Sequence, residues 1–409
     1  MKRWWRNPQS LCLAIFWSFF SLVAQAQDPF ISKELNRIVI PGDSSAFRRL
    51  FHKMDSLVRF GKGQINIVHI GGSHVQADIY SHRIRQRLRS YFPGFEGARG
   101  FVFPYAVAGT NNPSNYKVEY GGRWTTCRNV SATPCPLGLS GISITTRDTS
   151  AWIRIIPGSE PTAGYRFNRV RLFHPVDTSV MQIDVGVPEV IDFEWINPEL
   201  GFTEYHIRKH LDTLIFYVSP GPRCGHSFTL FGVQFLNEDP GIVYHSLGVN
   251  GAATSSFLRC GLFVPHLKAV KPDLVIFSLG VNDAHGPSFS KETFKENYRQ
   301  LVSWVRQAQK DAAVLFITNN DTYLRRRYPN ERHPEARDGM MEVAQECGGG
   351  VWNLYDIMGG RGSIVRWHAA GLAQSDLVHF TREGYTRIGD ALFEAFIHLW
   401  STFNRGSAR

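Results

Sequence analysis

The sequence predicts a three-layer α/β/α fold that is interrupted by an all-β domain. Helical and strand patterns alternate from about 45 to 103 and again from 242 to 400, as in right-handed βαβ units that build a parallel sheet. Between these flanks, short segments rich in Val, Ile, Phe, Tyr and Thr follow one another without a convincing helix. The chain has 409 residues, which is long for one ordinary core. We therefore expect two domains, one inserted into the other.

The first flank is predicted to contain two helices with a strand between them. Ser45 to Phe60 has apolar residues at helical spacing, and Ile65 to Ile70 is a short apolar strand. Ile79 to Tyr91 is a basic helix with Ile84 and Leu88 on one face.

The second flank continues this alternation of strands and helices. Its expected elements are a strand at 242–246, a helix at 254–269, a strand at 274–279, a helix at 291–309, a strand at 313–318, a helix at 335–347, a strand at 350–354 and a helix at 383–399. The strand from Leu274 to Leu279 is dominated by apolar residues, which is typical of a strand buried on both faces of a parallel sheet. The flanks, 27–103 and 242–409, are assigned to one discontinuous domain.

The middle of the chain, 104–241, is interpreted as an inserted β-sandwich. Its expected strands are 151–156, 166–174, 180–187, 190–196, 203–208, 213–218 and 226–236. Gly, Pro, Asn and Asp break these segments at short intervals. The block falls between the helix at 79–91 and the strand at 242–246, inside the α/β pattern, so its two ends are expected to lie close together.

The N-terminus has the pattern of a signal peptide over residues 1–26. Lys2, Arg3 and Arg6 precede an apolar run from Leu11 to Val23, and Ala24-Gln25-Ala26 is a small-x-small cleavage site. The apolar run is shorter than the roughly 20 residues of a membrane span. We expect an exported protein, periplasmic, extracellular or envelope-associated, with no transmembrane segment in the mature chain. An uncleaved anchor is the alternative.

The charge of the chain favours an anionic partner. Removing residues 1–26 takes away three positive charges and no acidic ones, so the formal net charge of +10 falls to +7. A moderately basic exported protein suits an anionic envelope or an acidic polymer. The Lys and Arg residues are dispersed, and export also argues against nucleic acid as a partner.

Five cysteines remain after removal of the signal peptide. Cys127 and Cys135 lie in a stretch rich in Gly, Pro, Ser and Thr, and an oxidising compartment permits a disulfide between them. Cys224, Cys260 and Cys347 show no metal-ligand spacing, and the odd count leaves at least one thiol free or bonded elsewhere.

Ser73 is a candidate nucleophile because it directly follows the strand at 65–70. Ligands of open α/β sheets bind beyond the carboxyl ends of the strands. Gly71 and Gly72 allow a sharp turn that exposes both the hydroxyl and the amide of Ser73. The alternative is that Ser73 only caps the following helix.

Asp376 and His379 are candidates for activating this serine. A histidine can take the proton of a serine hydroxyl, and a carboxylate on its other ring nitrogen fixes the tautomer and stabilises the imidazolium. The two residues are three positions apart in a loop before the last helix, so both side chains can face the same way. A helix-capping Asp next to a surface His is the alternative.

An oxyanion hole is expected from the amides of Ser73 and Gly251 and the side chain of Asn282. Attack on an ester builds negative charge on the carbonyl oxygen, which fixed N–H donors stabilise. Gly248 could replace Gly251 as the donor. Asn282 and Asp283 follow a buried strand, so an ordinary turn is the alternative, with Asp283 in a structural role.

Together these segments resemble the SGNH hydrolases, also called GDSL-type esterases. The specific matches are Leu-Gly-Val-Asn-Asp at 279–283 and Asp-x-x-His-Phe-Thr-x-x-Gly-Tyr at 376–385. The resemblance covers around 200 residues of the two flanks. It implies a flavodoxin-like three-layer fold without metal or cofactor. It also implies roles for the family's Ser, Gly, Asn, His and Asp, which here are Ser73, Gly251, Asn282, His379 and Asp376.

The resemblance departs from the family pattern at one position. The first block of the family usually reads Gly-Asp-Ser, and Gly72 replaces that aspartate here. The aspartate is not one of the chemical groups, so its loss leaves every catalytic role assigned. A non-catalytic, glycan-binding protein on the same fold remains an alternative.

The inserted module is similar to the arrangement in bacterial peptidoglycan O-acetylesterases, where a carbohydrate-binding-like module interrupts the hydrolase. This likeness implies a serine esterase that removes O-acetyl groups from an envelope polysaccharide, peptidoglycan first. An acetylesterase acting on plant or other polysaccharides and a lipase-like esterase are the rival enzymes. The aromatic residues that could stack on sugar rings are Trp124, Trp152, Trp195 and Tyr205, although most aromatics of a β-sandwich belong to its core.

Overall fold

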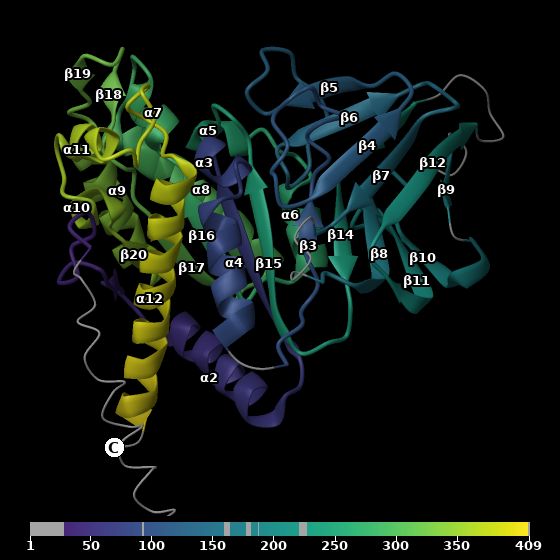
Figure 1. Cartoon of the computed structure of the whole chain (residues 1–409), viewed down its shortest axis with the longest axis horizontal. Helices are drawn as coiled ribbons and strands as arrows, with labels where there is room; N and C mark the ends of the chain where they lie inside the picture. Colours follow the sequence, from purple (N-terminus) through teal and green to yellow (C-terminus); the bar gives the residue numbers. More distant parts are fainter. Residues whose placement is uncertain are drawn as a thin grey trace, which may run out of the picture.

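The computed structural model describes residues 28–91, 94–158, 164–176, 181–186, 188–220 and 227–407 (Figure 1). The predicted signal peptide and Cys224 lie outside the described residues.

A six-stranded sheet carries the α/β part of the molecule, in the order β1-β20-β17-β16-β2-β15. Its strands are β1 (Ile38–Val39), β2 (Gln64–Gly71), β15 (Gly241–Gly248), β16 (Leu274–Ser278), β17 (Ala313–Ile317) and β20 (Gly350–Trp352). All neighbours are parallel except β1, which runs antiparallel to β20 at the edge. Numbered along the chain, the parallel strands lie in the order 2-1-3-4-5, which is the flavodoxin-like order. The predicted α/β class is therefore confirmed.

Helices cover both faces of this sheet. One face carries α2 (Ser45–Phe60), α4 (Tyr80–Tyr91) and α12 (Arg382–Ser407), and the other carries α6 (Phe263–Val270), α8 (Lys291–Ala308) and α9 (His333–Cys347). Successive strand side chains alternate between the two faces, so Ile67 packs in one core and Val68 in the other. No helix in the part of the chain that the structure describes has both the length and the apolar character of a membrane span.

The helix expected over 254–269 is wrong, because two shorter helices occupy this stretch. They are α5 (Thr254–Phe257) and α6 (Phe263–Val270). The backbone N–H of Leu262 donates to Leu137 O at 3.1 Å, and Leu262 forms a parallel bridge with Gly138. This contact with the inserted region replaces the hydrogen bonds that a continuous helix would make, so tertiary pairing overrides local helical preference.

The inserted region is entirely β apart from a short 3₁₀ turn, as far as the structure describes it. Its five-stranded sheet contains β10 (Ile191–Asn197), β11 (Phe202–Leu211), β8 (Phe167–Phe173), β14 (Gly232–Leu236) and β3 (Gly100–Val102). A four-stranded sheet contains β4 (Lys117–Gly121), β7 (Trp152–Ile156), β12 (Leu214–Pro220) and β9 (Met181–Val185), and a three-stranded sheet contains β13 (Phe228–Leu230), β6 (Ile142–Thr146) and β5 (Thr125–Arg128).

The inserted region differs from the sequence prediction in two places. The segment expected as one strand at 226–236 forms β13 and β14, which belong to different sheets. The strands β3 to β6 were not predicted. We keep 27–103 with 242–409, and 104–241, as a proposed division into domains, although β3 already pairs with β14 before residue 104. The ends of the insertion do meet, since the N–H of Glu96 donates to Pro240 O at 2.9 Å.

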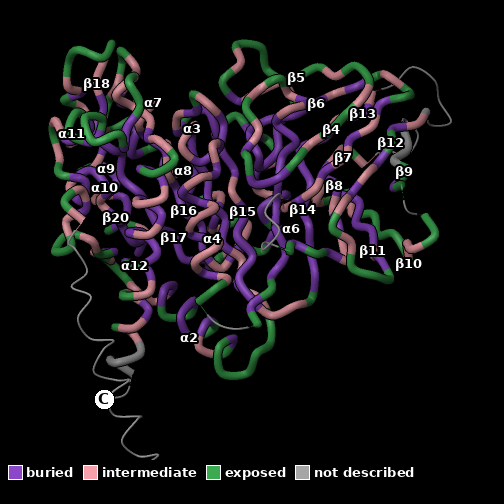
Figure 2. Tube along the Cα trace, viewed as in Figure 1, coloured by how far each residue is buried: buried purple, intermediate pink, exposed green. Residues whose placement is uncertain are grey.

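The insertion and the α/β part share one hydrophobic core. Val68 and Leu247 of the parallel sheet belong to the same buried cluster as Phe173 and Phe231 of the insertion. Buried residues lie in β15 of the parallel sheet and in β14 and β8 of the inserted region (Figure 2). Tight packing of this kind fixes the position of the insertion beside the sheet edge.

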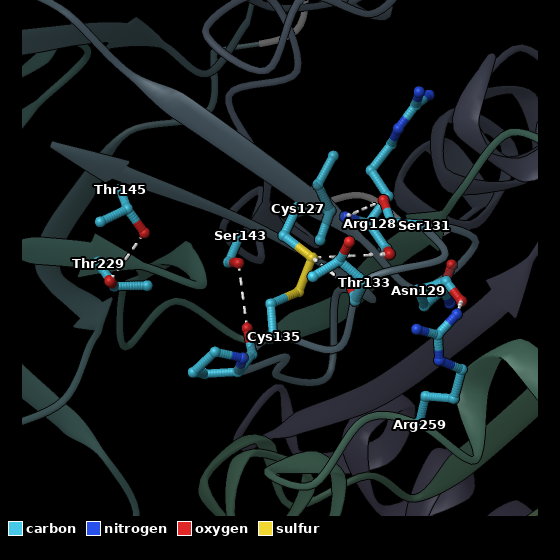
Figure 3. The surroundings of a disulfide bond; sticks show 12 residues. Cys127, Arg128, Asn129, Ser131, Thr133, Cys135, Ser143, Thr145, Thr229 and Arg259 are labelled. Carbon is cyan, nitrogen blue, oxygen red and sulfur yellow. Dashed lines mark hydrogen bonds between the residues drawn. A yellow bond between two sulfur atoms is a disulfide. The ribbon is translucent and has the colours of Figure 1, made fainter.

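Cys127 and Cys135 form a disulfide, as predicted, with their Cα atoms 6.4 Å apart (Figure 3). The bonded cysteines enclose a loop that is attached to the α/β part, because Arg259 Nη1 donates to Asn129 O at 2.9 Å. Cys260 and Cys347 are free thiols.

Replacing both Cys127 and Cys135 with serine should lower the free energy of unfolding by about 2–3 kcal/mol, because an unbridged unfolded chain regains the entropy of an open loop. Urea unfolding followed by tryptophan fluorescence measures this loss. Cys347→Ser is the matched control and should change stability far less. An equal loss in both variants would contradict the prediction.

Candidate active site

Ser73 stands at the carboxyl end of β2, where the chain turns into the short helix α3 (Ser73–Gln76). A Cβ atom added to Gly71 would lie 2.2 Å from Val75 Cγ2 and 2.9 Å from Ser278 O, so this turn requires glycine. The N–H of Ser73 is the first of the helix and has no acceptor within the described residues. Its hydroxyl oxygen lies 2.7 Å from His379 Nε2.

His379 and Asp376 lie in the loop between α11 (Ser363–Ala369) and α12. His379 Nδ1 lies 2.7 Å from Asp376 Oδ2, and Asp376 Oδ1 accepts from the backbone N–H groups of Val378 and His379, both at 2.9 Å. The structure therefore brings the three predicted side chains into one hydrogen-bonded chain, from Ser73 through His379 to Asp376.

The charge state of Asp376 suits this arrangement. Burial raises the pKa of its carboxyl, but hydrogen bonds from the backbone N–H and the ring of His379 and from Val378 outweigh burial, so the pKa lies below its ordinary value. An ionised Asp376 accepts the proton of His379 Nδ1, which leaves Nε2 free to accept the proton of Ser73.

The loop that carries Asp376 and His379 is held by the segment after β17. Asn320 Nδ2 donates to Val378 O at 3.0 Å, and the N–H of Tyr323 donates to Leu377 O at 3.1 Å. Leu377 has a φ of 56°, a left-handed conformation that these contacts stabilise.

Gly251 presents a free amide beside Ser73. It has a φ of 82°, in a turn closed by the Ala252 N–H on Val249 O at 3.0 Å, and its own N–H has no acceptor among the described residues. The alternative donor, Gly248, has its N–H directed at the Tyr105 hydroxyl at 3.3 Å. Of these two glycines, Gly251 is therefore the one with an available amide.

Asn282 lies on α7 (Val281–His285) and not in the turn that was the alternative reading. Its Nδ2 donates to Ala252 O at 3.0 Å, which leaves one amide hydrogen for another acceptor. Asp283 has the structural role expected for it, since it accepts from the N–H and the hydroxyl of Thr254 and so joins α7 to α5.

One cleft of about 700 Å³ is lined by Ser73, Gly251, Asn282 and His379. Its lining residues are Ser73, Ala77, Ile79, Asn111, Asn250, Gly251, Val281, Asn282, His285, Gln374, Val378, His379, Phe380 and Tyr385. Of the five predicted site residues, only Asp376 does not line the cleft. It contacts His379, which does. No group of three or more His, Cys, Asp and Glu side chains within the described residues could hold a metal ion.

Sequence reasoning missed several residues of this site. His74 Nδ1 lies 2.6 Å from the Tyr385 hydroxyl, and burial lowers the pKa of His74 to about 3, so its ring is neutral beside His379. His285 Nε2 lies 2.7 Å from Thr322 Oγ1. His285 is one helical turn from Asn282, a spacing that could have indicated it.

The aromatic residues considered for sugar stacking have different environments. Tyr205 is 5% exposed and belongs to the core, whereas Trp195 is 46% exposed on β10. Trp124 is half-buried and uses its indole N–H on Gly121 O. Tyr205 is therefore excluded as a stacking surface.

Comparison with known proteins bears on the family of the chain. Residues 217–387 match the model of the GDSL-like Lipase/Acylhydrolase family. Over this range the chain is similar to the SGNH/GDSL-type hydrolases. The matched range contains Gly251, Asn282, Asp376 and His379, whereas Ser73 lies on the other side of the insertion. The match supports a carboxylic ester hydrolase.

One solved structure has a similar fold over most of the chain. A peptidoglycan O-acetylesterase superposes with a TM-score of 0.75 at 21% identity, over 89% of this chain and 99% of that chain. A putative GDSL-like lipase from Parabacteroides merdae matches with a TM-score of 0.31 at 18% identity, over 38% of this chain and 72% of its own. An acetyl-xylooligosaccharide esterase from Geobacillus also has a TM-score of 0.31, at 16% identity over 38% and 73% of the two chains. No curated protein sequence matches.

The pH dependence of stability is expected to reflect Asp321, next to the Asn320 that holds the loop of Asp376 and His379. Burial raises the pKa of Asp321 to about 6 against opposing hydrogen bonds from Ile364 and Gly362. Below pH 3.8 the carboxyl is protonated in both the folded and the unfolded state, and the fold is most stable with respect to this group. The free energy of unfolding then falls as the pH rises through 6, because the buried carboxyl must ionise. Asp321→Asn should therefore raise the melting temperature more at pH 8 than at pH 4.

Thermal unfolding of both proteins across this pH range measures the effect. Asp338→Asn, which changes an exposed carboxylate on α9, is the matched control. An Asp321→Asn shift that is the same at pH 4 and pH 8 would contradict the raised pKa.

Proposed function

We propose that this hydrolase removes O-acetyl groups from an envelope polysaccharide, peptidoglycan first, through a Ser-His-Asp triad and an acyl-enzyme. The observation that carries the proposal is the chain of two 2.7 Å contacts from Ser73 through His379 to Asp376, with Ser73 and His379 on an open cleft. A hydroxyl, an imidazole and a carboxylate in this order are the groups that serine acyl transfer requires.

In the first half of the reaction, the Ser73 oxygen attacks the acetyl carbonyl carbon while His379 Nε2 takes the hydroxyl proton. Asp376 keeps the ring of His379 in the correct tautomer and stabilises the imidazolium. The C–O bond to the sugar then breaks, and the sugar oxygen leaves with the proton from His379. The acetyl group stays on Ser73 as an ester.

Three N–H donors are assigned to the oxyanion of the tetrahedral intermediates: the amides of Ser73 and Gly251 and the remaining Nδ2 hydrogen of Asn282. Two of these amides have no other acceptor among the described residues, so they need no reorganisation when charge develops on the carbonyl oxygen. Asn282 is held in place through Ala252, on the same turn as Gly251.

In the second half, water replaces the sugar. His379 takes a proton from the attacking water, the acyl bond to Ser73 breaks, and the proton returns to the Ser73 oxygen as acetate departs. Bonds and protons balance without a cofactor or a metal ion.

The choice of a glycan substrate is supported by the cleft and by the composition of the chain. Among the described residues that line the cleft, Asn111, Asn250 and Gln374 are neutral amides and none is Lys, Arg, Asp or Glu, as suits the hydroxyl-rich surface of a sugar. The predicted signal peptide and the basic mature chain support an exported enzyme that acts on a polymer of the envelope. The fold-level likeness to a peptidoglycan O-acetylesterase favours peptidoglycan among such polymers.

Ser73→Ala should abolish turnover of p-nitrophenyl acetate, because the variant has no oxygen to accept the acyl group. Hydrolysis followed by the release of p-nitrophenol measures this loss. Ser303→Ala, at an exposed position of α8, should retain full activity. Undiminished turnover by Ser73→Ala would refute the proposed nucleophile.

Asn282→Ala should lower kcat by roughly 10²–10³-fold, because one oxyanion donor is lost. Steady-state kinetics on the same ester provides the measurement, and circular dichroism checks that the variant is folded. A change below about threefold would remove Asn282 from the oxyanion hole.

The substrate class is tested by the acetate that the mature protein releases from O-acetylated peptidoglycan and, in parallel, from acetylated xylan. We expect faster release from peptidoglycan. Faster release from xylan would assign the enzyme to the acetylesterases of plant polysaccharides instead.

A further inference from the structure

A network of three amide side chains joins the helix that begins at Ser73 to the insertion. Gln76 is 1% exposed, and its Nε2 lies 3.1 Å from both the backbone O and Oδ1 of Asn111. Gln76 Oε1 accepts from the backbone N–H of Asn250 at 2.7 Å, and Asn250 Nδ2 donates to Asn111 Oδ1 at 2.6 Å. Asn111 and Asn250 both line the cleft that contains Ser73.

The backbone determines which end of each amide carries the oxygen. The main-chain N–H of Asn250 can only donate, so the group that faces it must be Oε1 of Gln76. Nε2 of Gln76 then faces three acceptors at 3.1 Å, which are Thr110 Oγ1, the Asn111 backbone O and Asn111 Oδ1. Asn111 Oδ1 also accepts from Asn250 Nδ2. The backbone contact fixes the Gln76 amide, and the amides of Asn111 and Asn250 are oriented to match it.

This arrangement leaves a defined set of donors and acceptors on the cleft. Asn250 Nδ2 uses its hydrogens on Asn111 Oδ1 and on Thr110 Oγ1, at 3.3 Å, so Asn250 Oδ1 is its remaining polar atom. Asn111 uses its Oδ1 as an acceptor, so its two Nδ2 hydrogens remain. Among the described residues, neither Asn111 Nδ2 nor Asn250 Oδ1 has a hydrogen-bond partner.

We propose that Asn111 and Asn250 form a subsite for the acetamido group of an N-acetylated amino sugar. The subsite rests on the proposed esterase function and narrows the class of sugar that the enzyme would deacetylate. A secondary amide carries one N–H and one carbonyl oxygen, which complement Asn250 Oδ1 and Asn111 Nδ2. The buried Gln76 holds both partners before the ligand arrives, so little side-chain entropy is lost on binding.

The position of the subsite fits a sugar that carries both the acetamido and the reacting ester. Asn250 immediately precedes Gly251, the assigned donor to the ester carbonyl, so the two groups are recognised side by side. Asn111 lies at the start of the insertion. The insertion therefore contributes directly to substrate recognition in the cleft, through a loop that the buried core holds in place.

The test uses two substrates that differ only at C2 of the sugar: an O-acetylated chito-oligosaccharide with acetamido groups and an O-acetylated cello-oligosaccharide with hydroxyls. We expect the wild-type enzyme to have a kcat/KM at least about tenfold higher on the chito-oligosaccharide, the discrimination of a site whose polar groups would otherwise stay unpaired. Asn111→Asp keeps the Oδ1 acceptor and removes the donor pair. This variant should lower the ratio of kcat/KM on the chito-oligosaccharide to kcat/KM on the cello-oligosaccharide about tenfold.

Gln307→Glu, at an exposed position of α8, is the matched amide-to-acid control and should leave the ratio unchanged. Asn250→Ala is the second variant and should also reduce the ratio. Equal wild-type rates on both sugars, an unchanged ratio in Asn111→Asp, or the same fall in Gln307→Glu would each overturn the subsite and leave the esterase function intact. Failure of the wild-type enzyme on both sugars and on p-nitrophenyl acetate would overturn the esterase function as well.

Discussion

In-register parallel pairing around β2 is the constraint on which the site depends. Gly71, at the end of β2, lies opposite Gly248 of β15 on one side and Ser278 of β16 on the other. Three neighbouring strands therefore end at one level of the sheet. The residues that follow these ends are Ser73, Gly251 and Asn282. A slip by one residue in either pairing would reverse the side chains of a whole strand and separate the donors from the hydroxyl.

The shared core gives the insertion a role beyond that of an appended domain. Because Phe173 and Phe231 pack in the same cluster as Val68 and Leu247, the insertion cannot shift without disturbing the sheet that carries Ser73. The same rigidity fixes Asn111 and the disulfide loop, whose Val130 lies 3.9 Å from a Cβ built on Gly251. The insertion thus borders both the cleft and the turn that contains Gly251.

The sequence could predict what short-range pattern and motif encode. Helix α2 has the predicted bounds, and the strands of the parallel sheet lie within two residues of theirs, because apolar periodicity is strong there. The break at Leu262 could not be predicted, since its cause is a contact with the distant Gly138. Asn111 carries no local signal either, because only the folded insertion brings it to the cleft.

Gly72 illustrates how a departure from a family pattern can be accommodated by its surroundings. Its φ of −88° lies outside the left-handed region that favours glycine. Space is the constraint, because a Cβ at position 72 would lie 3.2 Å from Asn282 Nδ2. A side chain there would displace the Asn282 amide by a few tenths of an ångström, in a site where donors must be held within about 0.5 Å. Gly72 therefore leaves the space that the present position of the Asn282 amide requires.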